Sequence, residues 1–443
     1  MNINDRRLLE DLHTLREFTD TPGEGVTRFS YGVQDRKARE YIIKEAMDAG
    51  CTVRTDDIGN IRIGLGANIP GQPVILCGSH IDTVRNGGWL DGIYGVCSAL
   101  EVLRTLAAAG SAAAPPDSSS AAALPDTAAT EQAAGCGYEM IIFAEEEGSN
   151  FGSTMTGSKF ITGIYGEAQL DELTNDDGQT LRQVLAGFAA ADPDAAAPGS
   201  ALQVPWDLSD AAAMLELHIE QGPVLERADL PIGIVDSIFG MRVIEVSLQG
   251  VGNHAGATPM KERYDALSTA AECILAAEKI VSSDPEERTV VTIGKLEVQP
   301  NCSNVIPETV RFSLEVRDKD AEEIDGNMDR IIHQIRQIAG GRGVKCEIRE
   351  HSKSAPLHLS DEIIAVIRQA AEDAGIPHKV MDSGAVHDAC MIAQAGVPTG
   401  MIFVPSIGGR SHVPEENTEE ADLVRGARLL LEVVCRLMGG AQA

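Results

Sequence analysis

The sequence predicts an α/β protein of two domains, and three features carry this prediction. Its 443 residues exceed what one hydrophobic core usually fills, so two domains are expected. Short apolar runs such as 74–77 and 140–144 are typical of strands buried on both faces, with helical patterns between them. From about Ser237, apolar and polar residues alternate instead, which is typical of half-buried antiparallel strands.

The elements of the larger domain follow in order along the chain. Residues 5–50 have the pattern of helices, and Gly50 suits the C-cap of the second one. Residues 93–109 predict another helix. Ligands of open α/β sheets bind at the carboxyl ends of the strands, so polar motifs in those places are expected to meet. Four buried strands are predicted to carry such motifs: 74–77 before His80, 140–144 before a glutamate triplet, 214–218 at His218, and 400–404 before His412.

The alternating region predicts a smaller domain of different construction. Strands are expected at 243–248, 310–316 and 345–348, and helices at 266–282 and 321–339. These are both helices and three of the four strands of a β-α-β-β-α-β order, which is typical of a ferredoxin-like domain. Helix and buried-strand patterns resume after about Ser352. We therefore expect a ferredoxin-like domain at 237–352, inserted between the two parts of a mixed-sheet domain at 1–236 and 353–443.

Two further segments lack the apolar periodicity that burial requires. Residues 110–134 are rich in Ala, Ser and Pro, and residues 189–201 are rich in Ala, Asp and Pro. Both are predicted to be surface insertions with no catalytic part.

Composition limits the partners and the compartment. A net charge of −31 argues against binding to nucleic acid or to anionic membranes. No uncharged apolar run approaches membrane-spanning length, and the first residues lack the apolar core of a signal peptide. The nine cysteines are scattered without any Cys-x-x-Cys pair, which indicates reduced thiols. We expect a cytoplasmic protein that binds neither nucleic acid nor membrane.

The polar motifs at the predicted strand ends contain the ligands of a two-metal site. His80, His218 and His412 supply three imidazoles, and Asp91 stands in a glycine-rich turn where it is the best candidate for a carboxylate that bridges two ions. Nitrogen and oxygen ligands of this kind suit Zn or Mn. Asp82 follows His80 at a spacing that lets a carboxylate orient the imidazole.

The glutamate triplet 145–147 directly follows a predicted buried strand, which is unusual for a solvated charge run. Adjacent side chains diverge, so one glutamate can bind metal while its neighbour faces the attacking water. Such a neighbour is suited to be a general base, because the nearby metal charge tunes its pKa.

Three longer motifs, together with those above, resemble a known family over nearly the whole chain. They are Glu-Glu-Gly-Ser-Asn-Phe at 146–151, His-Ile-Glu-Gln-Gly-Pro at 218–223 and Asn-His-Ala-Gly-Ala-Thr-Pro-Met at 253–260. The chain resembles the di-metal amidohydrolases of the aminoacylase and carboxypeptidase superfamily. Within it, the motifs are similar to the branch of N-carbamoyl-L-amino-acid hydrolases, allantoate amidohydrolases and β-ureidopropionases. The insertion at 110–134 is atypical of this family, and relatives often have a second glycine where Val386 stands.

The resemblance implies a role for each motif residue. Asp91 would be shared by two ions, and Glu146 would be the general base and then the general acid. His254 would reach the active site of the neighbouring subunit and stabilise the oxyanion. On residues alone, Asn304 and Arg317 remain open to reading as ordinary turn and strand-edge residues, and Gln221 as a turn cap. The implied ligands are His80, Asp91 and His218 for one ion and Asp91, Glu147 and His412 for the other, and the implied substrate contacts are Gln221, Asn304, Arg317 and His387.

The activity that the resemblance implies is hydrolysis of the carbamoyl group of N-carbamoyl-L-amino acids, which yields amino acid, ammonia and carbon dioxide. The expected cofactors are two divalent ions per subunit, Zn or Mn, with Co or Ni as further candidates. The expected partners are a small ureido substrate with a carboxylate and a second copy of the chain in a homodimer. Allantoate hydrolysis is the main alternative, and a peptidase or acylase of the same superfamily is another. A catalytically dead binding protein is disfavoured because none of the implied ligands is replaced.

Overall fold

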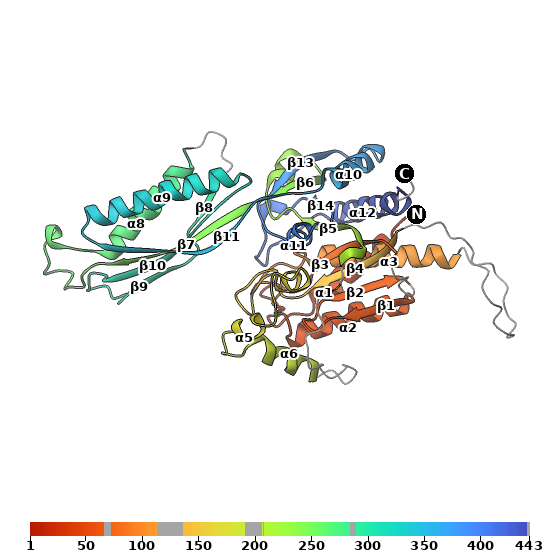
Figure 1. The fold of residues 1–443 in the computed structure, drawn as a ribbon, viewed down its shortest axis with the longest axis horizontal. Helices are drawn as coiled ribbons and strands as arrows, with labels where there is room; N and C mark the ends of the chain where they lie inside the picture. Colours follow the sequence, from red (N-terminus) through yellow and green to blue (C-terminus); the bar gives the residue numbers. More distant parts are fainter. Residues whose placement is uncertain (66–71, 113–135, 191–205, 207, 284–288, 441–443) are drawn as a thin grey trace. The chain divides into compact units, whose positions relative to one another are not determined.

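The computed structural model describes residues 1–65, 72–112, 136–190, 206, 208–283 and 289–440 (Figure 1). The two predicted insertions, 110–134 and 189–201, lie almost wholly outside the described residues. The chain divides into two compact units. We call them the large unit (Met1–Asp236, Leu359–Met381 and His387–Ala443) and the small unit (Ser237–His358 and Asp382–Val386).

The large unit is built on a mixed sheet in which the parallel strands are central. Strand β3 (Val74–His80) pairs in parallel with β4 (Gly137–Phe143) and β5 (Ala211–Ile219), and β5 pairs in parallel with β14 (Thr399–Val404). The prediction of an α/β protein with a mixed sheet is confirmed. The order is β1-β2-β4-β3-β5-β14-β6, with β13 also on β6; the outer strands are β1 (Cys51–Thr55), β2 (Ile61–Leu65), β6 (Ile232–Ile238) and β13 (His378–Ser383). The short strand β12 (Leu357–His358) pairs with the last two residues of β6, and these four residues fall within the small unit.

The central strands are buried over most of their length, as their short apolar runs predict. Every residue of β3 and β14 is buried, as are the last seven residues of β5. The strand predicted at 74–77 is longer than expected and includes His80 as its last residue. Cys77 lies opposite Leu215 in the parallel pairing of β3 with β5, so three residues later His80 comes level with His218. Register therefore places these two imidazoles at the same edge of the sheet.

Helices with apolar faces cover this sheet (Figure 1). In α1 (Asp5–Arg16), the Asn4 side chain accepts the backbone N–H of Arg7 as an N-cap, and Leu8, Leu12 and Leu15 are buried. In α3 (Ile93–Ala112), residues 93–110 are apolar and long enough to cross a membrane, but 78% of them are buried within the protein. This burial is typical of a core helix. The remaining helices are α2 (Val33–Asp48), α4 (Thr156–Ile161), α5 (Gln169–Glu172), α6 (Leu181–Ala190), α7 (Val224–Ala228), α10 (Asp361–Asp373), α11 (Asp388–Gln394) and α12 (Glu420–Gly440).

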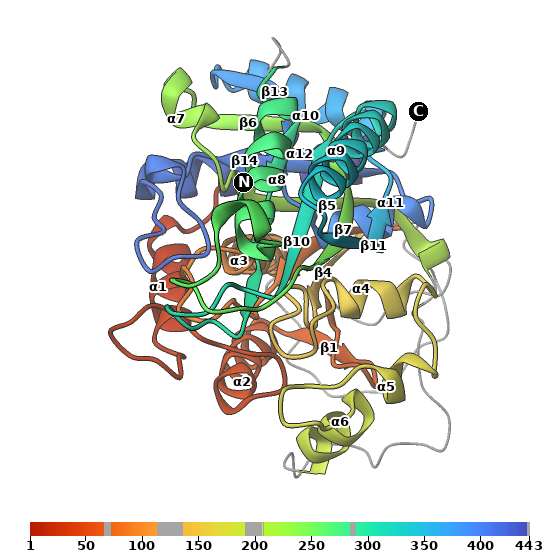
Figure 2. The same cartoon turned by 90° about the vertical axis from the view of Figure 1, so that its left-hand side faces the viewer.

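The small unit is an antiparallel sheet with two helices on one face. Its order is β11-β7-β10-β8, and β9 also pairs with β10. Helices α8 (Ala266–Val281) and α9 (Ala321–Gly341) run side by side and pack their apolar faces against alternate residues of β7 and β10 (Figure 2). The strands are β7 (Gly240–Gln249), β8 (Val290–Thr292), β9 (Leu296–Gln299), β10 (Thr309–Asp318) and β11 (Lys345–Ser354).

The approach of β3 to β4 generates a stability prediction at Gly78. A Cβ atom at this position would lie 1.8 Å from the carbonyl oxygen of Ile141 on β4. Because both atoms belong to paired backbones, Gly78→Ala is expected to destabilise the protein by about 1–3 kcal/mol, the usual cost of overpacking. The unfolding midpoint in urea measures this effect. Gly110→Ala is the matched control, since nothing lies within 4 Å of its added Cβ, and an equal loss in both variants would contradict the prediction.

Candidate metal centre

Three imidazoles surround the buried carboxylate of Asp91 in the large unit. The Nε2 atoms of His80 and His218 lie 3.5 and 3.2 Å from Asp91 Oδ1. His412, on the loop that follows β14, places its Nε2 3.1 Å from Asp91 Oδ2 and 3.5 Å from Glu147 Oε1. Asp91 lies two residues before the start of α3. The end of β3, the end of β5 and the loop after β14 thus bring their imidazoles to its side chain.

Main-chain carbonyls fix how two of these rings present their nitrogens. The Nδ1 atom of His80 lies 3.0 Å from the carbonyl oxygen of Asp82, and Nδ1 of His218 lies 2.9 Å from that of Ile219. A carbonyl oxygen only accepts, so each Nδ1 carries the proton and donates it. Each Nε2 therefore faces the carboxylate of Asp91 across 3.2–3.5 Å, and Nε2 of His218 also lies 3.1 Å from the backbone nitrogen of Gly92. A second proton on Nε2 lets a ring donate to Asp91, whereas the neutral ring offers the Nε2 lone pair to a cation.

The residues present fit a pair of divalent ions. His80, Asp91 and His218 offer ligand atoms within 4.8 Å of one another, and so do Asp91, Glu147 and His412. The two groups share Asp91. The buried Glu147 Oε1 has no hydrogen-bond partner, as expected for an oxygen that is a metal ligand. Imidazole and carboxylate donors of this kind suit Zn or Mn.

Electrostatics also favour a cation here. Burial opposes the charged form of Asp91, but hydrogen bonds from His218, His412 and His80 outweigh it and hold the Asp91 pKa well below its ordinary value. The hydrogen bond to Asp91 is the main cause that raises the pKa of His412 to about 9. Burial raises the pKa of Glu147 to about 7, and a neighbouring negative charge adds to this effect. Crowded buried carboxylates are costly unless positive charge compensates them.

The two adjacent glutamates point to different imidazoles. Asp82 holds their backbone: its Oδ1 accepts the N–H of Glu146 at 3.2 Å and its Oδ2 that of Glu147 at 3.0 Å. The Glu146 Oε2 atom then lies 3.7 Å from His80 Nε2, whereas Glu147 turns toward His412. Glu145 has neither role, because it points inward and accepts the N–H groups of the loop at 150–151.

Asp82 therefore acts differently from the sequence expectation. Its carboxylate lies 3.7 Å from His80 Nδ1, and its carbonyl oxygen, not its side chain, accepts the hydrogen bond of the ring. The carboxylate orients the glutamate backbone instead.

Gln221 and His387 also lie in this region of the large unit. The Gln221 Nε2 atom donates to Asp91 Oδ2 at 2.7 Å, while its Oε1 is buried without a hydrogen-bond partner. His387 is buried, and its ring centroid is 4.7 Å from that of His218 in an edge-on arrangement. Burial and the charge of His218 lower the His387 pKa well below its usual range, so the ring is neutral.

The other three predicted residues belong to the small unit. His254 and Asn304 lie on two neighbouring exposed loops, where the N–H of Ala255 donates to the carbonyl of Asn304 at 3.0 Å. The His254 Nδ1 atom accepts the N–H groups of residues 256 and 257, each at 3.1 Å, so its proton resides on Nε2. Arg317 stands near the far end of β10, where its Nε donates to Glu315 and its Nη1 to the carbonyl of Gly384.

Glu416 contacts the site but was not among the residues predicted from the sequence. This buried carboxylate binds the backbone of both Asp91 and His412. It stands four residues after His412, and that spacing is the one sequence signal that could have indicated it. Ser411, left out of the predicted site, also contacts Asp91, with 3.0 Å between its Oγ and Oδ2.

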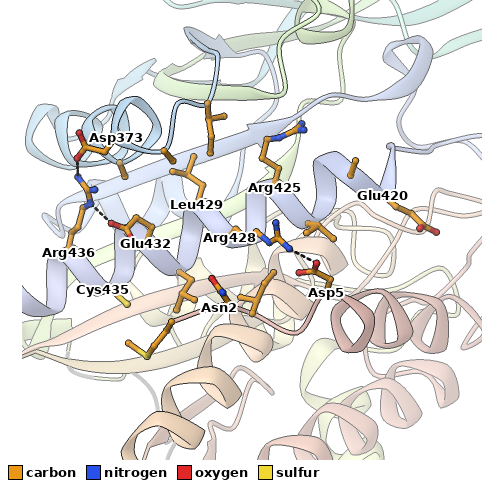
Figure 3. A pocket seen from close by; sticks show the side chains of 18 of the residues that line it. Asn2, Asp5, Asp373, Glu420, Arg425, Arg428, Leu429, Glu432, Cys435 and Arg436 are labelled. Atoms are coloured by element: carbon orange, nitrogen blue, oxygen red, sulfur yellow. Dashed lines mark hydrogen bonds and ion pairs between the residues drawn. The ribbon is translucent and has the colours of Figure 1, made fainter.

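A separate cavity of about 910 Å³ lies between the N-terminal residues, α10 and α12 (Figure 3). Its three arginines are each paired with an acid: Arg425 with Asp422, Arg428 with Asp5, and Arg436 with both Asp373 and Glu432. Its lining includes none of the metal-site residues, and its positive charges are already compensated.

Comparison with known proteins identifies the family. The model of peptidase family M20/M25/M40 matches residues 119–436. The chain belongs to this family. It is 36% identical to an N-carbamoyl-L-amino-acid amidohydrolase of Paenarthrobacter aurescens over 97% of both chains, and 34% identical to an allantoate amidohydrolase of Bacillus subtilis over 96% of this chain and 95% of the other. A crystal structure of a hydantoinase/carbamoylase family amidase from Burkholderia multivorans matches with a TM-score of 0.83 and 30% identity, over 99% of this chain and 98% of that one. The resemblance inferred from the motifs is confirmed.

The divergence of the two glutamates can be tested with one isosteric change at each position. Glu146→Gln is expected to keep two ions per subunit and to lower kcat by about 10²–10⁴-fold, the usual contribution of a general acid–base group. Glu147→Gln is expected to lose metal, because it removes a ligand oxygen. Elemental analysis after dialysis, beside turnover, checks both. Equal metal loss in the two variants would contradict this division of roles.

Proposed function

We propose that this protein hydrolyses the ureido group of N-carbamoyl-L-amino acids with two divalent ions, and that allantoate is the alternative substrate. One observation carries the proposal: two groups of three ligands share Asp91. The matches of nearly full length to amidohydrolases of both substrates supply the substrate class. In sum, the carbamoyl amino acid and one water yield the amino acid, ammonia and carbon dioxide.

His80, Asp91 and His218 would hold one ion, and Asp91, Glu147 and His412 the other. Zn or Mn fits these ligands best, and Co or Ni is also compatible with them. When bound, such a pair lowers the pKa of water and polarises the carbonyl of the substrate.

Glu146 would move the proton. Its side chain is buried beside His80 but belongs to neither group of three ligands. Burial is the main cause that raises the Glu146 pKa well above its ordinary value, which suits a group that first takes a proton and then returns it. Its Oε2 would accept the proton of the attacking water and deliver it to the amino nitrogen that leaves.

Arg317 would bind the substrate carboxylate. Glu315 Oε1 lies 2.6 Å from its Nε, and the carbonyl of Gly384 lies 3.0 Å from its Nη1, so the guanidinium is held in one orientation. Three of its five N–H groups remain for a carboxylate. Gln221 and His387 would contact the rest of the substrate from the large unit.

The layout of the small unit supports an active site shared by two subunits. Arg317 lies eight residues along β10 from Thr309, which is roughly 26 Å at a rise of about 3.3 Å per residue. His254 and Asn304 lie beyond the Thr309 end, since Gln249 pairs with Thr309 and His254 bridges to Val305. A small substrate cannot touch both ends of one small unit. If both ends bind it, they come from different subunits.

Exposed apolar side chains support the small unit as an inserted ferredoxin-like dimerisation domain. Among the described residues, seven of the twelve exposed large apolar side chains lie in this unit, which is less than a third of the chain. Such concentration is typical of an interface. The seven are Val251, Met260, Tyr264, Leu267, Leu275, Val290 and Leu296.

All nine cysteines are free, which supports a cytoplasmic location.

Ammonia release from a panel of substrates tests the proposed activity. N-carbamoyl-L-amino acids are expected to give the highest kcat/KM, with allantoate as the comparison that decides between the two candidates. N-acetyl amino acids and dipeptides, assayed by release of free amino acid, represent the acylase and peptidase alternatives. Higher kcat/KM on those compounds would contradict a carbamoyl hydrolase.

Substitution of Arg317 tests the carboxylate contact. Arg317→Lys keeps the charge but loses the planar fork, so kcat/KM for the acid substrate should fall at least tenfold. The methyl ester of the same substrate should be poor with the parent enzyme and lose little more with the variant. Equal losses on acid and ester would remove Arg317 from the binding site.

Mixed dimers test whether His254 acts in the neighbouring subunit. Homodimers of Glu146→Gln and of His254→Ala should each be nearly inactive, the latter by about 10²–10³-fold, as for loss of one oxyanion donor. In a heterodimer, one site combines an intact Glu146 with His254 of the other subunit. Activity should therefore return in proportion to the heterodimer fraction, isolated by two different affinity tags. Inactive heterodimers would show that His254 does not act across the dimer.

A further inference from the structure

We propose that Glu416 is a positioning residue that aligns Asp91 with His412 and thereby sets the affinity of the second metal position, the one formed by Asp91, Glu147 and His412. This inference rests on the proposed two-metal function. Glu416 itself belongs to neither ligand group.

The evidence is the set of donors that converge on this one buried carboxylate. Oε1 accepts the backbone N–H groups of Leu90 and Asp91, at 2.9 and 3.0 Å. Oε2 lies 2.8 Å from the hydroxyl of Ser411 and 3.3 Å from the backbone nitrogen of His412. Glu416 thus joins two loops more than 300 residues apart in sequence, and each of them carries a ligand of the second position.

A glycine makes room for this carboxylate. A Cβ atom at Gly88 would lie 2.0 Å from both Cδ and Oε1 of Glu416. The φ angle of Gly88 is not positive, so close approach, and not backbone conformation, explains the glycine. Gly88 therefore leaves the space that the carboxylate of Glu416 occupies.

The two metal positions depend on Glu416 to different degrees. His80 and His218 lie on buried strands, and their rings are fixed by main-chain carbonyls at 3.0 and 2.9 Å. His412 stands on a loop, has a positive φ of 60°, and its side chain is about half exposed. Its backbone N–H is bound by Glu416. Loss of Glu416 should therefore weaken the second position more than the one formed by His80, Asp91 and His218, of which only Asp91 contacts Glu416.

Calorimetric titration of the metal-stripped full-length protein with Mn²⁺ tests this inference. The parent should bind two ions per subunit. Glu416→Ala should weaken the binding of one ion about 10–100-fold, as is usual when the partner of a metal ligand is removed, and weaken the binding of the other much less. Gly88→Ala should have the same effect without any change of charge, because its methyl group displaces the carboxylate. Glu415→Ala, at the exposed neighbouring position, is the matched control and should bind like the parent.

Two results would overturn the inference: parent-like affinities in both Glu416→Ala and Gly88→Ala, or equal weakening of both ions in both variants. If Glu416→Ala does not fold, Glu416→Gln takes its place. Its amide oxygen can still accept two N–H groups, but its NH₂ group cannot accept from His412, so the same one-ion weakening is expected. A parent that binds fewer than two ions would contradict the proposed function as well. A parent that binds two ions, beside variants that also bind them normally, would contradict only the role of Glu416.

Discussion

The interaction on which this structure depends is the contact of one buried carboxylate, Asp91, with three imidazoles. Each imidazole nitrogen lies 3.1–3.5 Å from an oxygen of Asp91. Such a cluster needs compensating positive charge, either protons on the imidazoles or bound cations, because several buried carboxylates lie close together. The surrounding structure holds the cluster nonetheless: carbonyls orient His80 and His218, Asp82 holds the two glutamates apart, and Glu416 joins the remaining loop. The fold thus prepares a site whose electrostatics a pair of divalent ions would satisfy.

Much of this site could be predicted from the sequence because strand burial leaves a clear signal. The strands that end at or near His80 and His218 contain short apolar runs, and parallel strands place their carboxyl ends at one edge. His412 and Asp91 do not lie on strands, so the other motifs of the set and the family resemblance indicated them. The α/β class followed from the same buried runs, whereas the pairing order of the strands had no signal in the sequence.

Other features depend on backbone geometry that a sequence does not display. The ring tautomers follow from which carbonyl faces each Nδ1, and Asp82 binds amides and not the imidazole because of the path of the chain after β4. Glu416 has no apolar strand before it, and it meets Asp91 only through the folding of a distant loop. In the small unit, His254 and Arg317, to which the family resemblance gives roles in the active site, lie toward opposite ends of β10. That separation, roughly 26 Å by the rise of a strand, is what makes a shared active site necessary if His254 and Arg317 bind one substrate.

The most direct test of this account is reconstitution of ammonia release by counted equivalents of metal. Protein stripped with a chelator should be inactive on an N-carbamoyl-L-amino acid, and Zn²⁺ or Mn²⁺ should restore turnover. Activity should reach its maximum only at two equivalents per chain, because the second ligand group shares Asp91 with the first. Full activity in a verified metal-free sample, or a maximum at one equivalent, would contradict the two-metal centre.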